Sequence, residues 1–192
     1  MCSRLNSNSA VVSVKWGLNA IKQMLKYLGL TALIVALDHG TKYWAIVALK
    51  GKAAWPHGWT LFRFDYAENY NMAFSMSFIP MPLVNTLAIG AMGLLFYLLW
   101  DYKDKHVMPS IGLALILGGA FGNIPERLIR GYVVDFLSAD WPDWLFFTRW
   151  PTFNIADSAV NIGMVLYLGY VFFVEGKQSK TDLPSESVSP NN

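Results

Sequence analysis

The segment GYVVDFLSADWPDWLFFTRWPTFNIADSAVNIG, residues 131–163, holds two aspartates in apolar surroundings. Asp135 follows two valines and precedes a phenylalanine, and Asp157 immediately precedes another apolar run. A carboxylate in such a setting is costly unless it is paired or functional. Asp135 and Asp157 are therefore the first candidates for a functional site.

The apolar run that begins near residue 155 has counterparts elsewhere in the chain. A bilayer span needs about 20 apolar residues. Four runs meet or approach that length, and we predict four transmembrane helices at 27–49, 79–100, 107–124 and 155–174. Pro80 and Pro82 fall in the first turn of the second run, where proline is tolerated.

The composition indicates a membrane protein. Of 192 residues, 54% are hydrophobic and 15% charged, with a mean hydropathy of +0.34. Four such runs leave too little polar surface to enclose them in a small soluble domain. The net charge of +2 is too small to indicate nucleic-acid binding.

The distribution of Lys and Arg predicts the orientation. Eight lie on the side of the N-terminus, the 101–106 connection and the tail, against six in the other two connections. The bias is strongest at the N-terminus, so we expect both termini to be cytoplasmic and the connections 50–78 and 126–154 to face outward. We predict a cytoplasmic segment at 1–24, a membrane domain at 25–175 and a disordered, polar cytoplasmic tail at 176–192, with the polar composition beginning at Glu175.

The outward connections contain their own structural signals. The stretch LFRFDY, residues 61–66, alternates apolar and polar residues, which predicts a strand. The stretch DWPDWLFFTRWPTF, residues 140–153, is rich in Trp and Phe. Such residues favour the membrane interface, where they could anchor the protein or form a lipid-facing platform beside a site.

Several further polar residues lie where lipid or a helix end is expected. Asp38 and Lys42 are four residues apart in the first span, which places them on one helix face, either as a structural ion pair or as part of a polar site. Asn69 precedes the second span as a turn residue or as an amide donor to substrate. Gly118 and Gly122 have the spacing that allows close helix packing.

Asp135 and Asp157 could form a catalytic pair. The first turn of the fourth helix favours a charged Asp157, and the apolar setting of Asp135 favours its protonated form. If the two meet, they share one proton, and one carboxylate can activate water while the other polarises a carbonyl. Their spacing alone leaves open whether they meet.

Five ordered motifs resemble those of the lipoprotein signal peptidases, the type II signal peptidases of bacteria. They are DHGTK at 38–42 for D-x-x-T-K, NYNMAF at 69–74 for N-x-G-x-A-F, GGAFGNIPER at 118–127 for G-G-x-x-G-N-x-x-D-R, GYVVDF at 131–136 for G-x-V-x-D-F, and FNIADS at 153–158 for F-N-x-A-D-S. The resemblance covers roughly residues 25–175.

The resemblance implies an intramembrane aspartic protease that cleaves diacylglyceryl-modified prolipoproteins just before the lipobox cysteine, in the cytoplasmic membrane with its site toward the outer face. It implies Asp135 and Asp157 as the catalytic pair and no metal or other cofactor. It also implies a β-structured outer cradle at 50–78 and a flanking loop at 137–152. We expect a monomer whose partners are precursor and membrane lipids. Supporting site positions by this likeness and by their place in the sequence are Asp38, Lys42, Asn69, Asn123, Arg127 and Asn154.

The chain departs from these motifs at a few positions, which bear on substrate preference rather than on the reaction class. Asn71 replaces a glycine and Glu126 an aspartate. Pro125 removes an amide donor between Asn123 and Arg127, and Asn161 is polar one turn after Asp157.

Three other readings remain open from the residues. A small transporter or proton relay could use the same acidic residues along a path, although they gather toward one face. A non-catalytic homologue could bind lipoprotein precursors. A Ser/Lys protease could use Lys42 as base with Ser75 or Ser158 as nucleophile.

Overall fold

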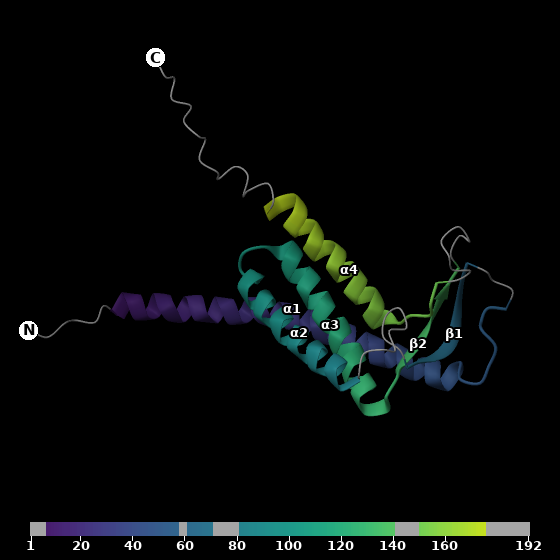
Figure 1. Ribbon diagram of the computed structural model, residues 1–192. Helices are drawn as coiled ribbons and strands as arrows, with labels where there is room; N and C mark the ends of the chain where they lie inside the picture. Colours follow the sequence, from purple (N-terminus) through teal and green to yellow (C-terminus); the bar gives the residue numbers. More distant parts are fainter. Residues whose placement is uncertain (1–6, 58–60, 71–80, 141–149, 176–192) are drawn as a thin grey trace, which may run out of the picture.

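A computed structural model describes residues 7–57, 61–70, 81–140 and 150–175. Its helices are α1 (Ser7–Ala48), α2 (Met81–Tyr102), α3 (Val107–Arg130) and α4 (Ile155–Tyr170), the last continued by a π-helical turn at Val171–Glu175. Its strands are β1 (Phe62–Asn69) and β2 (Val133–Ala139). The helices run alongside one another, and the two strands lie together at one end of them (Figure 1).

Among the described residues, three helical segments are long and apolar enough to cross a membrane: Gly17–Ala48, Val107–Arg130 and Ile155–Glu175. The described apolar part of α2, Thr86–Tyr102, is shorter. The helical membrane fold is thus confirmed, with three spans by this criterion where the hydropathy predicts four.

The helix boundaries differ from the predicted spans because hydropathy marks lipid contact and not helix length. α1 begins at Ser7, about five and a half turns before the predicted start at 27. α3 continues past residue 124, through Pro125 to Arg130, and ends at Gly131, whose φ of 79° is a left-handed cap. The chain is still helical at Glu175, where Tyr102 Oη donates to Glu175 Oε1 at 2.7 Å.

α3 is the central helix of the bundle, and glycines allow the others to approach it. A side chain at Gly118 would meet Ile34 of α1 at 2.9 Å, and one at Gly163 of α4 would meet Ile116 at 2.7 Å. A Cβ at Gly119 would collide with the backbone carbonyl of Ala156. The close packing inferred from the glycine spacing is therefore present, and it holds the start of α4 against α3.

Gly119→Ala is expected to lower the free energy of unfolding by about 1–3 kcal/mol, since the new methyl group meets backbone that has no room to move. Thermal unfolding in detergent measures this as a lower midpoint temperature. Gly90→Ala in α2 is the matched control, because a Cβ there meets nothing within 4 Å and alanine favours helix. A midpoint for Gly119→Ala at or above that of Gly90→Ala would contradict this packing.

The small sheet closes one end of the bundle. β1, which contains most of the strand predicted at 61–66, pairs antiparallel with β2. The sequence of β2, VVDFLSA, is mostly apolar and does not alternate between apolar and polar residues, so it was not predicted as a strand. Val134 and Phe136 of β2 pack with Ala45 and Leu49 of α1, which fixes the sheet to the end of that helix.

Several predictions fall outside the described residues. The disordered tail at 176–192 is one, and most of the aromatic stretch at 140–153 is another. Asn71, Ser75 and Pro80 also lie outside them.

Candidate active site

Asp135 is placed by the pairing of β2 with β1. Ala67 of β1 lies opposite Asp135, and Asn69 is two residues further along, on the same face of the sheet. Asn69 Nδ2 donates to Asp135 Oδ2 at 2.9 Å. The Asp135 side chain is buried, with an exposed fraction of 2%.

Asp157 is placed by the start of α4, where the predicted position in the first turn is confirmed. Phe153 pairs with Leu137 of β2, so the helix begins beside the strand that carries Asp135. Asn154 caps the helix, and its Oδ1 accepts from the Asp157 backbone N–H at 2.9 Å. Asp157 Oδ2 accepts in return from the Asn154 backbone N–H at 3.1 Å, which completes a capping box.

The two aspartates meet at Asn154. Besides capping α4, the buried Asn154 donates from Nδ2 to Asp135 Oδ1 at 2.7 Å. One residue thus contacts both carboxyl groups, through its side chain on one and its backbone on the other. The proximity that sequence spacing left open is present in the structure.

The two carboxyl groups have different surroundings, which affect how readily each one is protonated. Burial and, to a smaller extent, the nearby Asp157 charge raise the pKa of Asp135 to about 7, against the lowering effect of the Asn69 and Asn154 amides. Asp157 is partly buried as well, and the two hydrogen bonds that it accepts at the N-terminus of a helix oppose the effect of burial on its carboxylate. The pair is suited to hold one proton, on Asp135.

Asn123 of α3 connects the aspartates to a buried lysine. Asn123 Nδ2 donates to Asp157 Oδ1 at 2.8 Å, and Asn123 Oδ1 accepts from Asn154 Nδ2 at 3.2 Å. The same oxygen accepts from Lys42 Nζ at 2.7 Å. Because the ammonium group can only donate, it requires the Asn123 oxygen to face it and the amide N–H to face Asp157.

Lys42 lies inside a cluster of charges at the end of the membrane domain. Its Nζ is 2.7 Å from Asp38 Oδ2 and 3.0 Å from Glu126 Oε2, and all three side chains are at most 6% exposed. Arg130 contacts the other Glu126 oxygen at 3.5 Å. The ion pair expected between Asp38 and Lys42 is present, with a second carboxylate that the pairing from sequence did not include.

Asp38 also fixes the start of α4. Its Oδ1 accepts from the Ala156 backbone N–H at 2.9 Å, so α1 and α4 are joined by a charged hydrogen bond at a helix N-terminus. A side chain at Gly122 would collide with Asp38 Oδ2 at 2.8 Å. The glycine therefore makes room for the carboxylate.

The remaining predicted site residue, Arg127, belongs to the last turn of α3 and is half-buried. The charges of Asp135 and Asp157 both act on its guanidinium group. All eight predicted positions therefore lie in one region, at the sheet end of the bundle.

Among the departures from the family motifs, Asn161 lies on an exposed face of α4, and Pro125 is accommodated within α3.

Glu126 is the residue of this cluster that sequence reasoning noted only as a departure. It lies three residues after Asn123 and four before Arg130, so the three share one face of α3. That spacing places Glu126 on the helix face of Asn123, but its contact with Lys42 of α1 depends on the packing of the two helices.

The contacts of Lys42 bear on the Ser/Lys reading. Its ammonium group forms ion pairs with Asp38 and Glu126, and it donates to the Asn123 side chain and to the Gly122 carbonyl at 3.2 Å. Ser158 donates instead to the Asn154 carbonyl at 3.1 Å. Lys42 is therefore not poised as a base for Ser158.

Within the described part of the chain, no group of three or more His, Cys, Asp and Glu side chains could hold a metal ion.

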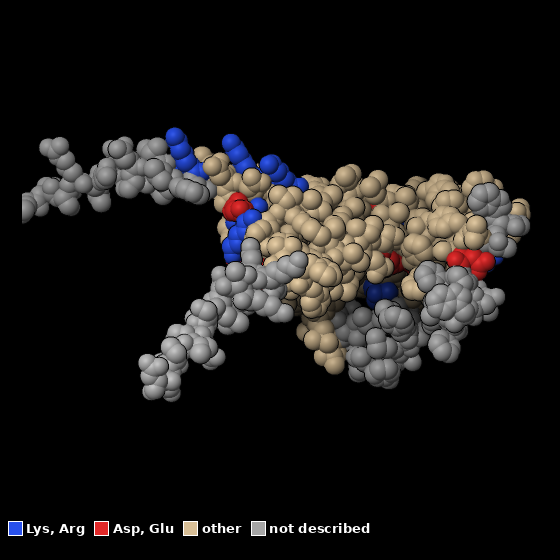
Figure 2. Space-filling view, turned by 90° about the horizontal axis from the view of Figure 1, so that it is seen from above, with Lys and Arg blue, Asp and Glu red and all other residues tan. Residues whose placement is uncertain are grey.

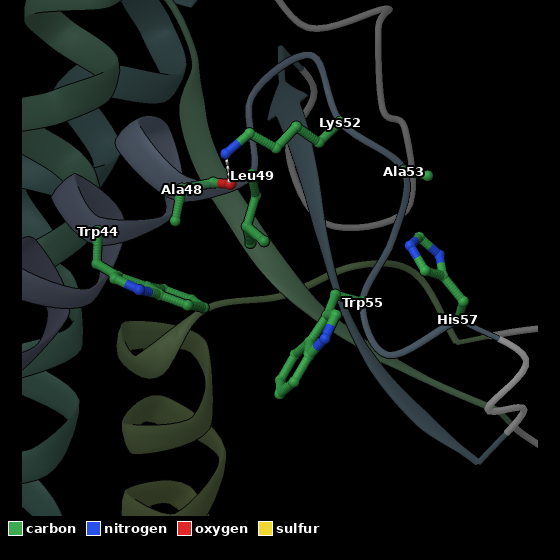
Figure 3. Close-up of a pocket in the computed structure, with 7 residues that line it drawn as sticks. All are labelled: Trp44, Ala48, Leu49, Lys52, Ala53, Trp55 and His57. Carbon is green, nitrogen blue, oxygen red and sulfur yellow. Dashed lines mark hydrogen bonds between the residues drawn. The ribbon is translucent and has the colours of Figure 1, made fainter.

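An open pocket of about 460 Å³ lies outside this polar cluster, at the end of α1 (Figure 3). It is lined by Trp44, Ala48, Leu49, Lys52, Ala53, Trp55 and His57. Trp44 contacts Phe136, which follows Asp135 in β2 and so points to the opposite face of the sheet. The pocket and the aspartates are on different faces.

Comparisons with known proteins bear on the fold and on the family. Two solved structures described as bacterial membrane enzymes share the fold, each with a TM-score of 0.65 and 23% identity. They cover 84% and 78% of this chain, and 93% and 94% of their own chains.

Sequence relatives are closer. The lipoprotein signal peptidase of Psychromonas ingrahamii is 40% identical, covering 83% of this chain and 90% of its own length. That of Pseudoalteromonas atlantica is 34% identical, covering 78% and 91%. Residues 30–173 match the family described as signal peptidase (SPase) II. With its long apolar helices, the chain is a multi-pass membrane peptidase that belongs to the signal peptidase II family.

Proposed function

We propose that the protein is an intramembrane aspartic endopeptidase that removes the signal peptide from diacylglyceryl-modified prolipoproteins, just before the lipobox cysteine. The relatives' name, lipoprotein signal peptidase, supports the substrate class. The observation that carries the catalytic type is the contact of Asn154 with both Asp135 and Asp157.

The proposal includes a four-span topology. α2 is the fourth span, since its 22 residues are enough to cross a bilayer. Both termini are cytoplasmic, and the sheet end faces outward. The membrane domain occupies 25–175, between a cytoplasmic segment at 1–24 and a cytoplasmic tail at 176–192. The site then lies near the outer membrane face, where the scissile bond of a lipid-anchored precursor would sit.

In the proposed reaction, Asp157 acts as base and Asp135 as acid. The Asp157 carboxylate takes a proton from water as the water oxygen attacks the scissile carbonyl carbon. Asp135 gives its proton to the carbonyl oxygen and stabilises the tetrahedral intermediate. When the C–N bond breaks, the departing cysteine nitrogen takes the proton from Asp157, and Asp135 recovers its own.

The supporting residues act through their contacts with the two aspartates. Asn69 and Asn154 hold Asp135, and Asn123 holds Asp157. Lys42, fixed by Asp38, sets the orientation of Asn123. Arg127 supplies positive charge beside the pair.

The rate of cleavage is expected to fall as pH rises through about 7. The pKa of Asp135 is raised to about 7, so the group keeps its proton below that pH and loses it above, and the reaction needs that proton. Single-turnover rates between pH 5 and 9 should therefore decline about tenfold per unit on the alkaline side, with an apparent pKa that belongs to the pair. A rate that stays constant from pH 6 to 9 would contradict a protonated Asp135.

The substrate is tested with purified protein in lipid and two forms of one lipobox precursor, with and without the diacylglyceryl group. The proposal predicts cleavage of the modified form only, and mass spectrometry of the product should find the lipidated cysteine at its N-terminus. Folded protein that binds the precursor without cleaving it would support a non-catalytic homologue instead. Cleavage at another position would contradict the proposed specificity.

A further inference from the structure

The N-terminal part of α1 projects beyond the helix bundle. Met24 is the first residue of α1 whose side chain is buried against the other helices, where it packs with Leu99 and Leu113. Before it, the described side chains are exposed or half-buried. Figure 1 shows this end of α1 extending away from the sheet and past the other helices. The projecting part also precedes residue 30, where the match to the peptidase family begins.

Three lysines form one stripe along this segment. Lys15, Lys22 and Lys26 are separated by seven and four residues, so they lie on the same side of the helix, and all three are exposed. Met24, which faces the bundle, is two residues from both Lys22 and Lys26, so the stripe points away from the bundle. Figure 2 shows the row of basic side chains along this part of α1.

The positive charge of the stripe has no acidic residue near it in the sequence. The first Asp or Glu of the chain is Asp38, while Arg4 and the three lysines all precede it. A second stripe, of Leu18, Ile21 and Leu25, runs beside the lysines, and these side chains are 52–61% exposed. Basic and apolar stripes side by side are typical of helices that contact a membrane surface.

The length of α1 places the stripe beside a bilayer. Its 42 residues extend about 63 Å, roughly twice the hydrocarbon thickness of about 30 Å. Counting about 20 residues back from Ala48 puts the hydrocarbon boundary near residue 29. Lys26 is then about 5 Å beyond the boundary, at headgroup level, and Lys22 is about 11 Å beyond it, just outside the headgroups but within reach of them for a long side chain. Lys15 is about 21 Å beyond it and reaches the headgroups when the segment tilts away from the bundle.

We propose that residues 15–26 of α1 bind the anionic phospholipid headgroups of the leaflet at the N-terminal end of the protein. The lysine stripe supplies charge complementarity, and it faces the leaflet when the segment tilts away from the bundle. Leu18, Ile21 and Leu25 lie beside it and enter the headgroup boundary. The binding is independent of the peptidase reaction and of which side of the membrane the N-terminus occupies.

Hydrogen exchange of the full-length protein in nanodiscs tests this. Discs of phosphatidylcholine alone are compared with discs of an equimolar mixture of phosphatidylcholine and phosphatidylglycerol. Backbone amides of residues 15–23 should exchange at least about tenfold more slowly in the anionic discs, since each lysine near an anionic surface contributes several-fold. The protection should disappear at about 1 M salt, where the screening length falls to about 3 Å.

Two variants with the same loss of charge provide the control. Lys15→Gln, Lys22→Gln and Lys26→Gln together should abolish the protection, whereas Lys50→Gln, Lys52→Gln and Lys105→Gln together should retain it. Equal exchange in the two lipids, or unchanged protection in the first variant, would overturn the proposal. Protection that depends on the number of protein copies per disc and not on the lipid would also overturn it, in favour of contact between copies. Precursor cleavage should stay unchanged in the first variant, which separates this test from that of the proposed function.

Discussion

Asp157→Asn is expected to lower the rate of precursor cleavage by about 10³-fold or more while leaving the protein folded. The amide has nearly the shape of the carboxylate but cannot take a proton from water, so the base of the proposed reaction is lost. Its remaining oxygen can still accept one of the two hydrogen bonds that Asp157 receives from Asn123 and Asn154. Removal of a partly buried charge offsets part of the cost of the lost bond.

The measurement pairs single-turnover cleavage with thermal unfolding in the same detergent. Asp65→Asn is the matched control, because Asp65 is a half-buried residue of β1, outside the polar cluster, whose contact with Arg63 is long, at 3.8 Å. It should leave both rate and midpoint close to those of the wild type. A variant of Asp157 that unfolds many degrees earlier would assign the residue a structural role instead.

Lys42→Met should produce the largest loss of stability. The methionine fills a similar volume but leaves Asp38 and Glu126 buried without their shared cation. Removing one partner from a buried ion pair costs about 3–5 kcal/mol of the free energy of unfolding. Arg130 compensates only part of this, since it contacts one Glu126 oxygen at 3.5 Å. Cleavage should also fall, because the Asn123 amide loses the donor that orients it toward Asp157.

Thermal unfolding of Lys42→Met is compared with that of Lys52→Met. Lys52 is exposed and donates to the Ala48 carbonyl at 2.8 Å, so its replacement should change the free energy of unfolding by less than about 1 kcal/mol. Adding Glu126→Gln to Lys42→Met should restore part of the stability by removing one unpaired charge. Equal midpoints for the two lysine variants would contradict a structural role for the charge cluster.

The sequence predicted those elements that carry a clear signal in hydropathy or in the alternation of apolar and polar residues. Long apolar runs identified the helices, of which three are long and apolar enough to span a membrane over the residues that the structure describes, and alternation identified β1. β2 was missed because its residues, VVDFLSA, do not alternate between apolar and polar, and a short, mostly apolar segment fits a buried strand or a buried helix equally well. The first turns of α1 were not predicted because that part of the helix is not continuously apolar and gives no hydropathy signal. Helix ends were also missed at Pro125, which the structure accommodates within α3.

For the site, the sequence predicted the residues but not the contacts between them. Hydropathy marked Asp135 and Asp157 as unusual. Position within or beside a predicted span marked Asp38, Lys42, Asn69, Asn123 and Arg127, and the motif resemblance added Asn154. Their contacts could not be predicted from spacing, because they depend on the pairing of β2 with Phe153 and of α1 with α3. The spacing of Asn154 and Asp157 does carry a local signal, a capping box, which fixes one carboxylate by itself. The role of Glu126 required the tertiary structure, since its partner Lys42 lies 84 positions earlier in the sequence.

The most direct test is a side-by-side measurement of precursor cleavage by the wild type, Asp135→Asn, Asp157→Asn and Asp65→Asn, each folded in the same lipid. The proposed pair predicts that the wild type and Asp65→Asn release the signal peptide at similar rates, and that Asp135→Asn and Asp157→Asn each lose at least about 10³-fold. Full activity in either Asp135→Asn or Asp157→Asn would contradict the aspartic mechanism.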